Sequence, residues 1–285
     1  MAKSIAERID ESFSSFSKGQ KRIASAIVNN YEKVAYMTAA RLGQIAEVSE
    51  STVVRFATEL GYPGYHEMQK AIQELLRTTL TSSQRVAVTN ELWEDKDVLS
   101  GVLNGDIAKI KYTLEHTERE VFAEAVTALL NARRIYLFGS RSSAALSQFL
   151  SYNLALIFDN VSHMDFSTPS EVFERLFSVG KGDVLFVFSF PRYSKTAIDV
   201  ARYAQGRGAL VLALTDSAQS PLATYADILL TAQSDMASFA DSLTAPLSLI
   251  NALLASIAKS KQEEITARLD KLEQLWEEYD VYDKR

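Results

Sequence analysis

The sequence predicts two fold classes in series: an all-α domain at the N-terminus, then an α/β domain built on a parallel sheet. In residues 1–77, apolar side chains recur at helical spacings. From about residue 134, short continuous apolar runs alternate with helical patterns, which is typical of parallel strands covered by helices on both faces. The stretch between them begins with a polar segment. We therefore assign residues 1–77 to the first domain, 78–97 to a linker and 98–285 to the second domain.

The bulk composition is that of a soluble globular protein, with 47% hydrophobic and 23% charged residues in a chain of 285. The chain has no cysteine, which excludes a disulfide framework and thiolate metal sites. Its three histidines are scattered, so we expect no metal and no cofactor. No apolar run approaches the roughly 18 residues of a membrane span, and the N-terminus lacks the apolar region of a signal peptide. We expect a cytoplasmic location and no membrane partner.

Two helices open the first domain. Their predicted inward residues are Ile5, Ile9, Phe13 and Phe16 in the first helix, and Ile23, Ile27 and Val28 in the second. Lys18, Lys21 and Arg22 cluster where the second helix begins. A helix N-terminus with cations beside it suits a phosphate group, whereas a solvated basic turn is the alternative interpretation.

Residues 38–65 predict two short helices joined by a tight corner at residues 47–49. Thr38 and Ser49 are expected N-caps, and Gly61 is the expected end of the second helix, where a positive φ favours glycine. The expected inner faces are Leu42, Ile45 and Ala46 in the first helix, and Val53, Phe56, Ala57 and Leu60 in the second.

Ser51, Thr52 and Arg55 remain on the outer face of that second helix, near its N-terminal end. Hydroxyls and a permanently charged guanidinium are groups that a recognition helix presents to base edges and phosphates in the major groove of double-stranded DNA. An ordinary helical hairpin with a polar outer face is the alternative. The net charge of −6 argues mildly against nucleic acid, but residues 1–80 carry ten Lys and Arg against nine Asp and Glu. A local basic face is sufficient for a sequence-specific binder.

The second domain is expected to alternate strands and helices. The expected strands are residues 134–138, 161–164, 183–188, 209–214 and 228–230. The expected helices are residues 98–116, 121–130, 144–158, 168–179, 197–205, 243–257 and 263–279.

Two of these strands are followed by loops that are rich in hydroxyl groups. Ligands of such sheets bind beyond the carboxyl ends of the strands, where loops feed the N-termini of helices. Serine hydroxyls, backbone N–H groups and a helix dipole can together hold a phosphate, although serines that merely cap helices are the alternative. Arg141 and Arg192 would add charged donors. The candidate ligand-binding residues are Ser140, Ser142 and Ser143 in the first loop, and Ser189, Arg192 and Ser194 in the second.

The pattern S-x-S-T-V-x-R-F-x-x-x-L-G-Y-x-G-Y, here Ser49 to Tyr65, resembles the helix-turn-helix of the RpiR/MurR family of bacterial transcription regulators. Members of that family carry a C-terminal sugar isomerase (SIS) domain, and residues 131–258 look like one. The resemblance thus implies a helix-turn-helix domain followed by a three-layer α/β SIS domain that binds a carbohydrate derivative.

In the family, loops of the form G-x-G-x-S and S-x-S-G-x-T bind the phosphate of a phosphosugar. By this resemblance Ser143 matches the serine of the first loop, and Ser189 and Ser194 match hydroxyl positions of the second. This chain departs from both loops: Arg141 replaces a glycine, and Pro191-Arg192 stands where serine-glycine is usual. The resemblance implies a small anionic ligand, with a phosphosugar or another acidic metabolite both open.

SIS domains also occur in isomerases, where a base abstracts a proton next to a carbonyl. Glu171 and His163 could be proposed for that role, but neither has a partner visible in the sequence, so we expect no enzyme. The expected function is a regulator that binds operator DNA as a homodimer or homotetramer, because one short helix covers only a half-site. The apolar helices around residues 98–130 and 243–257 would supply the contact between copies.

Overall fold

The computed structural model describes residues 4–93, 97–164, 168–236 and 238–283. The chain divides into two compact units. The first contains residues 1–98 together with 235–241, and the second contains residues 99–234 and 242–285. Each unit has its own hydrophobic core.

The first unit is all-α, as predicted. Its elements are α1 (Ile5–Ser12), η1 (Phe13–Ser15), α2 (Lys18–Asn29), α3 (Tyr31–Val34), α4 (Ala39–Ile45), α5 (Glu50–Glu59), α6 (Tyr65–Thr79) and α7 (Ser82–Trp93). Side-chain oxygens of Ser4, Ser17, Thr38 and Ser49 accept hydrogen bonds from the first turns of α1, α2, α4 and α5, so four hydroxyls fix where these helices begin. Phe56 and Ile23 are among the fully buried side chains of the core.

Three residues predicted to face inward lie on the surface instead. Phe13, Val28 and Ile45 are 40–47% exposed. For Ile45 the reason is the close packing of α4 against the corner before α5. A Cβ added at the buried Gly43 would lie 2.9 Å from the carbonyl oxygen of Val48, so α4 approaches the corner through its glycine. That orientation directs Ile45 outward.

The stretch predicted as a linker contains a helix. Arg85, Val88 and Thr89 of α7 are buried within the first unit. The Arg85 guanidinium forms an ion pair with Asp241 at 3.0 Å, and both belong to this unit. Because the partner of Arg85 lies far away in the sequence, the local polar composition alone indicated a linker and not a packed helix.

The second unit contains α8 (Val98–His116) from Leu99 onward, followed by the predicted alternation. Its further helices are α9 (Arg119–Asn131), η2 (Arg141–Ser143), α10 (Ala144–Ile157), α11 (Pro169–Arg175), α12 (Lys195–Gly206), η3 (Pro221–Tyr225), α13 (Thr244–Ser260) and α14 (Gln262–Glu278). Its strands are β1 (Ile135–Gly139), β2 (Val161–Met164), β3 (Val184–Phe188), β4 (Leu210–Thr215) and β5 (Ile228–Thr231).

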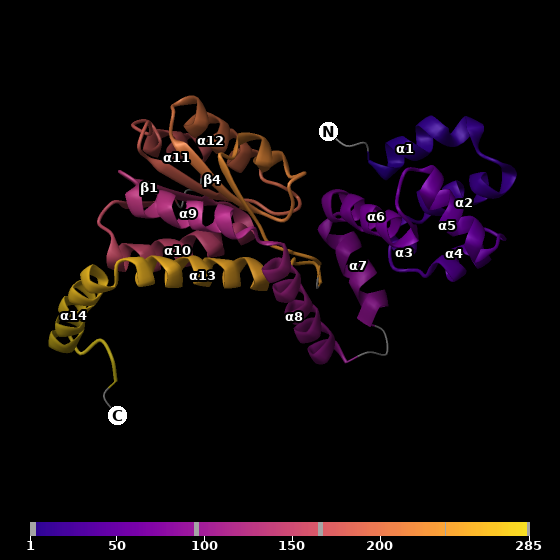
Figure 1. The fold of residues 1–285 in the computed structure, drawn as a ribbon. Helices are drawn as coiled ribbons and strands as arrows, with labels where there is room; N and C mark the ends of the chain where they lie inside the picture. The colour runs from indigo at the N-terminus through magenta and orange to yellow at the C-terminus, as the bar shows by residue number, and fades with distance from the viewer. Residues whose placement is uncertain (1–3, 94–96, 165–167, 237, 284–285) are drawn as a thin grey trace. The chain divides into compact units, whose positions relative to one another are not determined.

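The five strands form one parallel sheet in the order β2-β1-β3-β4-β5. Alternate strand residues enter two separate cores: Leu137 and Phe186 pack with α9, α10 and α13, whereas Tyr136 and Leu185 pack with α11 and α12. Helices therefore cover both faces of the sheet (Figure 1), and the three-layer α/β fold expected for this domain is confirmed. Among the described residues, no helix combines the length and the apolarity that a membrane span needs.

Candidate functional site

The corner between α4 and α5 is held by contacts from α2. Glu47 has a φ of 51°, a left-handed conformation that is uncommon for residues other than glycine. Arg22 donates to the Glu47 carbonyl oxygen at 2.7 Å and lies 3.3 Å from its carboxylate. The predicted phosphate anchor Arg22 is thus engaged in fixing the corner that orients α5.

The other two predicted anchors lie beside it at the start of α2. Lys18 is exposed, and the Lys21 ammonium lies 5.7 Å from the centroid of the Phe13 ring. A cation over an aromatic face is attracted by the ring quadrupole, so this contact engages the Lys21 ammonium. Of the three basic side chains, Lys18 is the most available to a phosphate.

Arg55 projects from the exposed face of α5. Its Nε donates to the carbonyl oxygen of Ser51 at 3.3 Å, and its two terminal nitrogens form no hydrogen bond or ion pair within the part of the chain that the structure describes. Val53, Phe56 and Ala57 of the same helix are fully buried. The helix is thereby anchored along one face and presents its guanidinium on the other, as predicted.

The hydroxyls of Ser51 and Thr52 are drawn into the cap of the helix. Ser49 Oγ lies 2.9 Å from Ser51 Oγ and 2.8 Å from Thr52 Oγ1, and it accepts from the Thr52 backbone N–H. The three hydroxyls form one cluster at the N-terminus of α5. They shape the end of the helix in addition to any contact they make outside it.

The two predicted ligand loops meet at the carboxyl edge of the sheet. Strands β1 and β3 are hydrogen-bonded neighbours, and Gly139 at the end of β1 is in register with Phe188 at the end of β3. Ser140 and Ser189 follow directly, so the pairing of β1 with β3 brings the two serine-bearing loops together.

The first loop folds tightly back on its strand. A Cβ at Gly139 would lie only 2.3 Å from the carbonyl oxygen of Ser143, so this position requires glycine. Ser143 is buried, whereas Ser142 is exposed. The Ser140 Oγ is buried and has no hydrogen-bond partner among the described residues. Buried hydroxyls are nearly always paired, which makes Ser140 the polar atom at this edge that most lacks a partner.

The second loop is stabilised by its own serines. Ser189 Oγ accepts from the backbone N–H of Ser194 at 3.1 Å, and Ser194 Oγ caps α12 by accepting from the N–H of Ala197. Thr215, at the end of β4, donates to the Ser189 carbonyl oxygen at 2.6 Å. The capping role that the sequence left as an alternative therefore holds for Ser194, and a third strand supports this loop.

Both loops carry an arginine on a left-handed backbone. Arg141 has a φ of 57° and Arg192 a φ of 60°, and both side chains are exposed. A residue with a Cβ is disfavoured there by roughly 1–2 kcal/mol, a cost that glycine avoids. Strained positions of this kind concentrate at functional sites, so the two guanidiniums are candidates for a ligand contact that offsets the strain.

Sequence reasoning missed a polar contact between the second and third loops. The Tyr193 hydroxyl lies 3.0 Å from Asp216 Oδ1 and 3.2 Å from Oδ2, and Asp216 directly follows β4. The signal was present, because polar residues follow the ends of β1, β3 and β4 alike. The carboxylate adds a hydrogen-bond acceptor to this edge of the sheet.

The two residues considered for catalysis have structural partners. Glu171 accepts from the backbone N–H of Thr168 at the start of α11. His163 Nε2 lies 3.2 Å from Ser147 Oγ, which itself donates to the carbonyl oxygen of Ala144.

Two family models match the chain: the helix-turn-helix domain of the rpiR family over residues 3–79, and the SIS domain over residues 128–256. The chain is 28% identical over 232 residues to the HTH-type transcriptional regulator HexR of Pseudomonas aeruginosa, covering 78% of this chain and 76% of HexR.

Two solved structures share the fold. One is the sugar isomerase domain of an RpiR transcription factor from Sphaerobacter thermophilus, with 28% identity and a TM-score of 0.59, covering 61% of this chain and 97% of that one. The other is the NanR protein of Vibrio vulnificus complexed with ManNAc-6P, with 22% identity and a TM-score of 0.59, covering 96% and 98%. The helical first unit, the parallel sheet of the second and both family matches lead to one conclusion: the chain joins a helix-turn-helix domain of the rpiR family to a SIS domain.

Proposed function

We propose that α5 reads operator DNA and that the carboxyl edge of the sheet binds a small anionic metabolite that controls this reading. The observation that carries the proposal is Arg55, which presents its terminal nitrogens on the face of α5 opposite to the core. Ser51 and Thr52 stand beside it, and Lys18 is the foremost phosphate anchor, with Lys21 and Arg22 next to it. Bidentate arginine contacts to guanine are the commonest specific contacts in a major groove.

A phosphosugar is the ligand class that we propose for the sheet edge. NanR, which shares the fold, was solved with ManNAc-6P. In this chain the supporting features are the buried Ser140 hydroxyl, which has no hydrogen-bond partner within the described part of the chain, and the exposed guanidiniums of Arg141 and Arg192. Guanidinium groups bind phosphate through charge-assisted hydrogen bonds.

We propose further that the second unit senses its ligand without converting it, and that the protein acts in the cytoplasm. Glu171 and His163 are each engaged within the fold. The test is incubation of the protein with common aldose and ketose phosphates. Turnover that disappears in a Glu171→Gln or His163→Ala variant would reject a pure sensor and favour an isomerase.

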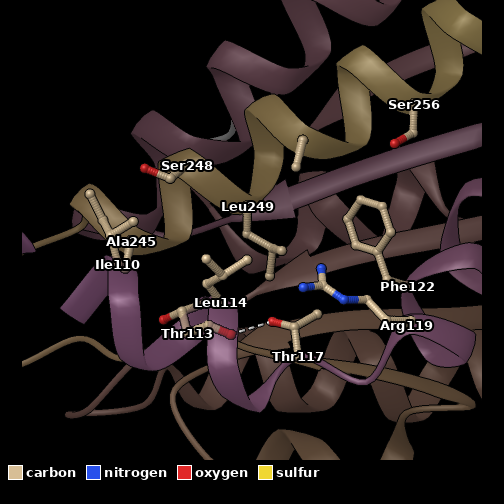
Figure 2. Close-up of a pocket in the computed structure, with 11 residues that line it drawn as sticks. Ile110, Thr113, Leu114, Thr117, Arg119, Phe122, Ala245, Ser248, Leu249 and Ser256 are labelled. Atoms are coloured by element: carbon tan, nitrogen blue, oxygen red, sulfur yellow. Dashed lines mark hydrogen bonds between the residues drawn. The ribbon is translucent and has the colours of Figure 1, made fainter. Parts of the chain in front are cut away.

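A second copy of the chain is the partner that we propose for α8. Leu103, Ile107 and Leu114 of this helix are each more than half exposed. Figure 2 shows Leu114 together with Leu249 and Phe122 lining a groove among α8, α9 and α13. An exposed apolar stripe that leads into an apolar groove is typical of an interface between subunits. Ile107→Glu should shift sedimentation toward monomers and leave the far-UV circular dichroism unchanged.

Two-fold symmetric copies would place two α5 helices on two operator half-sites. Ligand binding changes DNA affinity only if the ligand prefers one arrangement of the two DNA-reading units. The direction of the response, release or recruitment, follows from which arrangement the ligand prefers.

The decisive experiment measures DNA and ligand binding separately in one variant. Arg55→Ala should abolish the gel shift of the DNA upstream of the gene and leave the ligand-induced rise in melting temperature intact. Arg202→Ala, which removes an exposed arginine from the second unit, is the matched control and should change neither. Retention of specific DNA binding by Arg55→Ala would refute the proposed role of α5.

A further inference from the structure

The outer face of α5 carries one apolar side chain among polar ones. Val54 is 39% exposed, while its neighbours Val53 and Phe56 are fully buried. The exposed residues of the helix recur at helical spacing along one face, and they are Glu50, Ser51, Val54, Arg55, Thr58 and Glu59. Val54 therefore sits within the surface that is proposed to face DNA.

Most hydroxyl groups on this face are already engaged. Ser51 and Thr52 contact Ser49 in the helix cap, and Thr58 Oγ1 donates to the Val54 carbonyl oxygen at 3.2 Å. Apart from the carboxylate of Glu50, which the phosphates of DNA would repel, the groups of this face with the least intramolecular competition are the terminal nitrogens of Arg55 and the isopropyl group of Val54. One is a charged donor fork and the other is purely apolar.

The major groove offers a specific target for each of these groups. Guanine presents two acceptors that fit a guanidinium, and thymine presents a C5-methyl group, the one apolar feature in the direct-readout code of that groove. We infer that Val54 contacts the 5-methyl group of an operator thymine close to the guanine bound by Arg55. This inference rests on the proposed function of α5.

The spacing of the two residues limits where that thymine lies. Adjacent Cα atoms are about 3.8 Å apart, and successive bases on one strand are about 3.4 Å apart along the helix axis. Side chains of neighbouring residues on one exposed helix face thus reach neighbouring base pairs. The thymine is expected within about two base pairs of the guanine, on either strand.

A protein partner would need far more than Val54. A stable protein–protein interface covers about 800 Å² on each side, whereas the neighbours of Val54 on α5 are charged or hydroxyl-bearing. A single methyl contact in a groove that is otherwise read by polar groups needs no larger apolar surface.

The test uses DNA that differs only in methyl groups. The full-length protein selects its binding site from random duplexes, and each thymine of that site is then replaced singly by deoxyuridine. Wild-type protein should lose about four-fold in affinity at one thymine in each half-site, the value expected for one buried methyl group. At that position, the Val54→Ala variant should bind the thymine and deoxyuridine duplexes with equal affinity.

The chain provides a matched control in Val86 on α7, which is 41% exposed in the same unit. Val86→Ala should retain the full discrimination between thymine and deoxyuridine. The inference is overturned if wild-type protein is indifferent to every replacement, or if Val54→Ala weakens binding without changing any methyl preference. Failure to select any DNA sequence would instead refute the proposed function itself.

Discussion

The two candidate sites of this protein are built by different means. On α5 the candidate residues lie along one face of a regular helix, and the helix is positioned by conventional caps and a buried inner face. At the sheet edge, the side chains come from loops after β1, β3 and β4, and two of them stand on left-handed backbone. A site on one helix can be read from local spacing, whereas a site on several loops depends on how distant strands pair.

In each unit a glycine allows two backbone segments to pack closely. Adding a methyl group at one of these glycines should impair the function of its own unit and spare that of the other. Gly139→Ala places a Cβ 2.3 Å from the Ser143 carbonyl oxygen, and Gly43→Ala places one 2.9 Å from the Val48 carbonyl oxygen. Each should destabilise its own unit by about 1–3 kcal/mol, as overpacking does. Calorimetry that resolves the unfolding of the two units would measure this.

The functional losses should follow the same division. Gly139→Ala should impair ligand binding and spare DNA binding, and Gly43→Ala should do the reverse. If either variant lost both ligand binding and DNA binding, the two sites would not be structurally independent. Gly206→Ala is a suitable control, because its added Cβ would meet no described atom within 4 Å beyond its chain neighbours and the backbone of its own helix.

Replacing either left-handed arginine by glycine should raise the stability of the protein and weaken ligand binding. Arg141→Gly and Arg192→Gly each remove a Cβ from a left-handed position and should raise the free energy of unfolding by about 1 kcal/mol. The same substitutions should weaken binding of a phosphosugar. Glu47→Gly is the matched control in the first unit: it relieves the same backbone conformation, removes one exposed ion pair with Arg22, and should leave ligand binding unchanged.

Unchanged ligand affinity in both arginine variants would show that these two side chains do not contact the ligand. Differential scanning fluorimetry with and without ligand gives both quantities in one experiment.

The smallest expected effect concerns acid stability of the second unit. Burial opposes ionisation of Asp183, but hydrogen bonds from Arg133 and the Gly180 N–H outweigh it, so the pKa of Asp183 lies below its ordinary value. A depressed carboxyl pKa contributes stability above the unfolded-state pKa of about 4, and that contribution is lost as pH falls through the folded-state pKa.

Asp183→Asn should therefore melt at a lower temperature than wild type at pH 7, and the difference should shrink below about pH 4. Thermal unfolding followed by circular dichroism across this range measures it. The exposed Asp270→Asn provides a comparison, and a difference that grows on acidification would contradict the assignment.

The sequence was sufficient for nearly all secondary structure, because buried strands and amphipathic helices leave local patterns. The helix at residues 98–116 and the strand at 161–164 were predicted with the bounds that the structure has. Helix α7 was missed, since the burial of Arg85 depends on an ion pair with Asp241, far along the chain. Ile45 was misplaced, since the orientation of α4 is set by the contact at Gly43.

The candidate site residues divide in the same way. The exposure of Arg55 followed from helical spacing. The engagement of Arg22 with the corner, and of Tyr193 with Asp216, could not be predicted, because each joins residues that only the folded backbone brings together. The left-handed arginines were visible only as departures from a glycine pattern, because the local sequence does not determine their backbone angles.

The conformation of Arg141 and Arg192 bears on how the ligand range of such a regulator could diversify. Every arginine codon becomes a glycine codon by one nucleotide change, and at both positions the backbone already suits glycine. The charge of the proposed ligand-binding edge can therefore be adjusted in single genetic steps that the scaffold tolerates. Related regulators could in this way acquire responses to differently charged metabolites while the operator-binding unit stays the same.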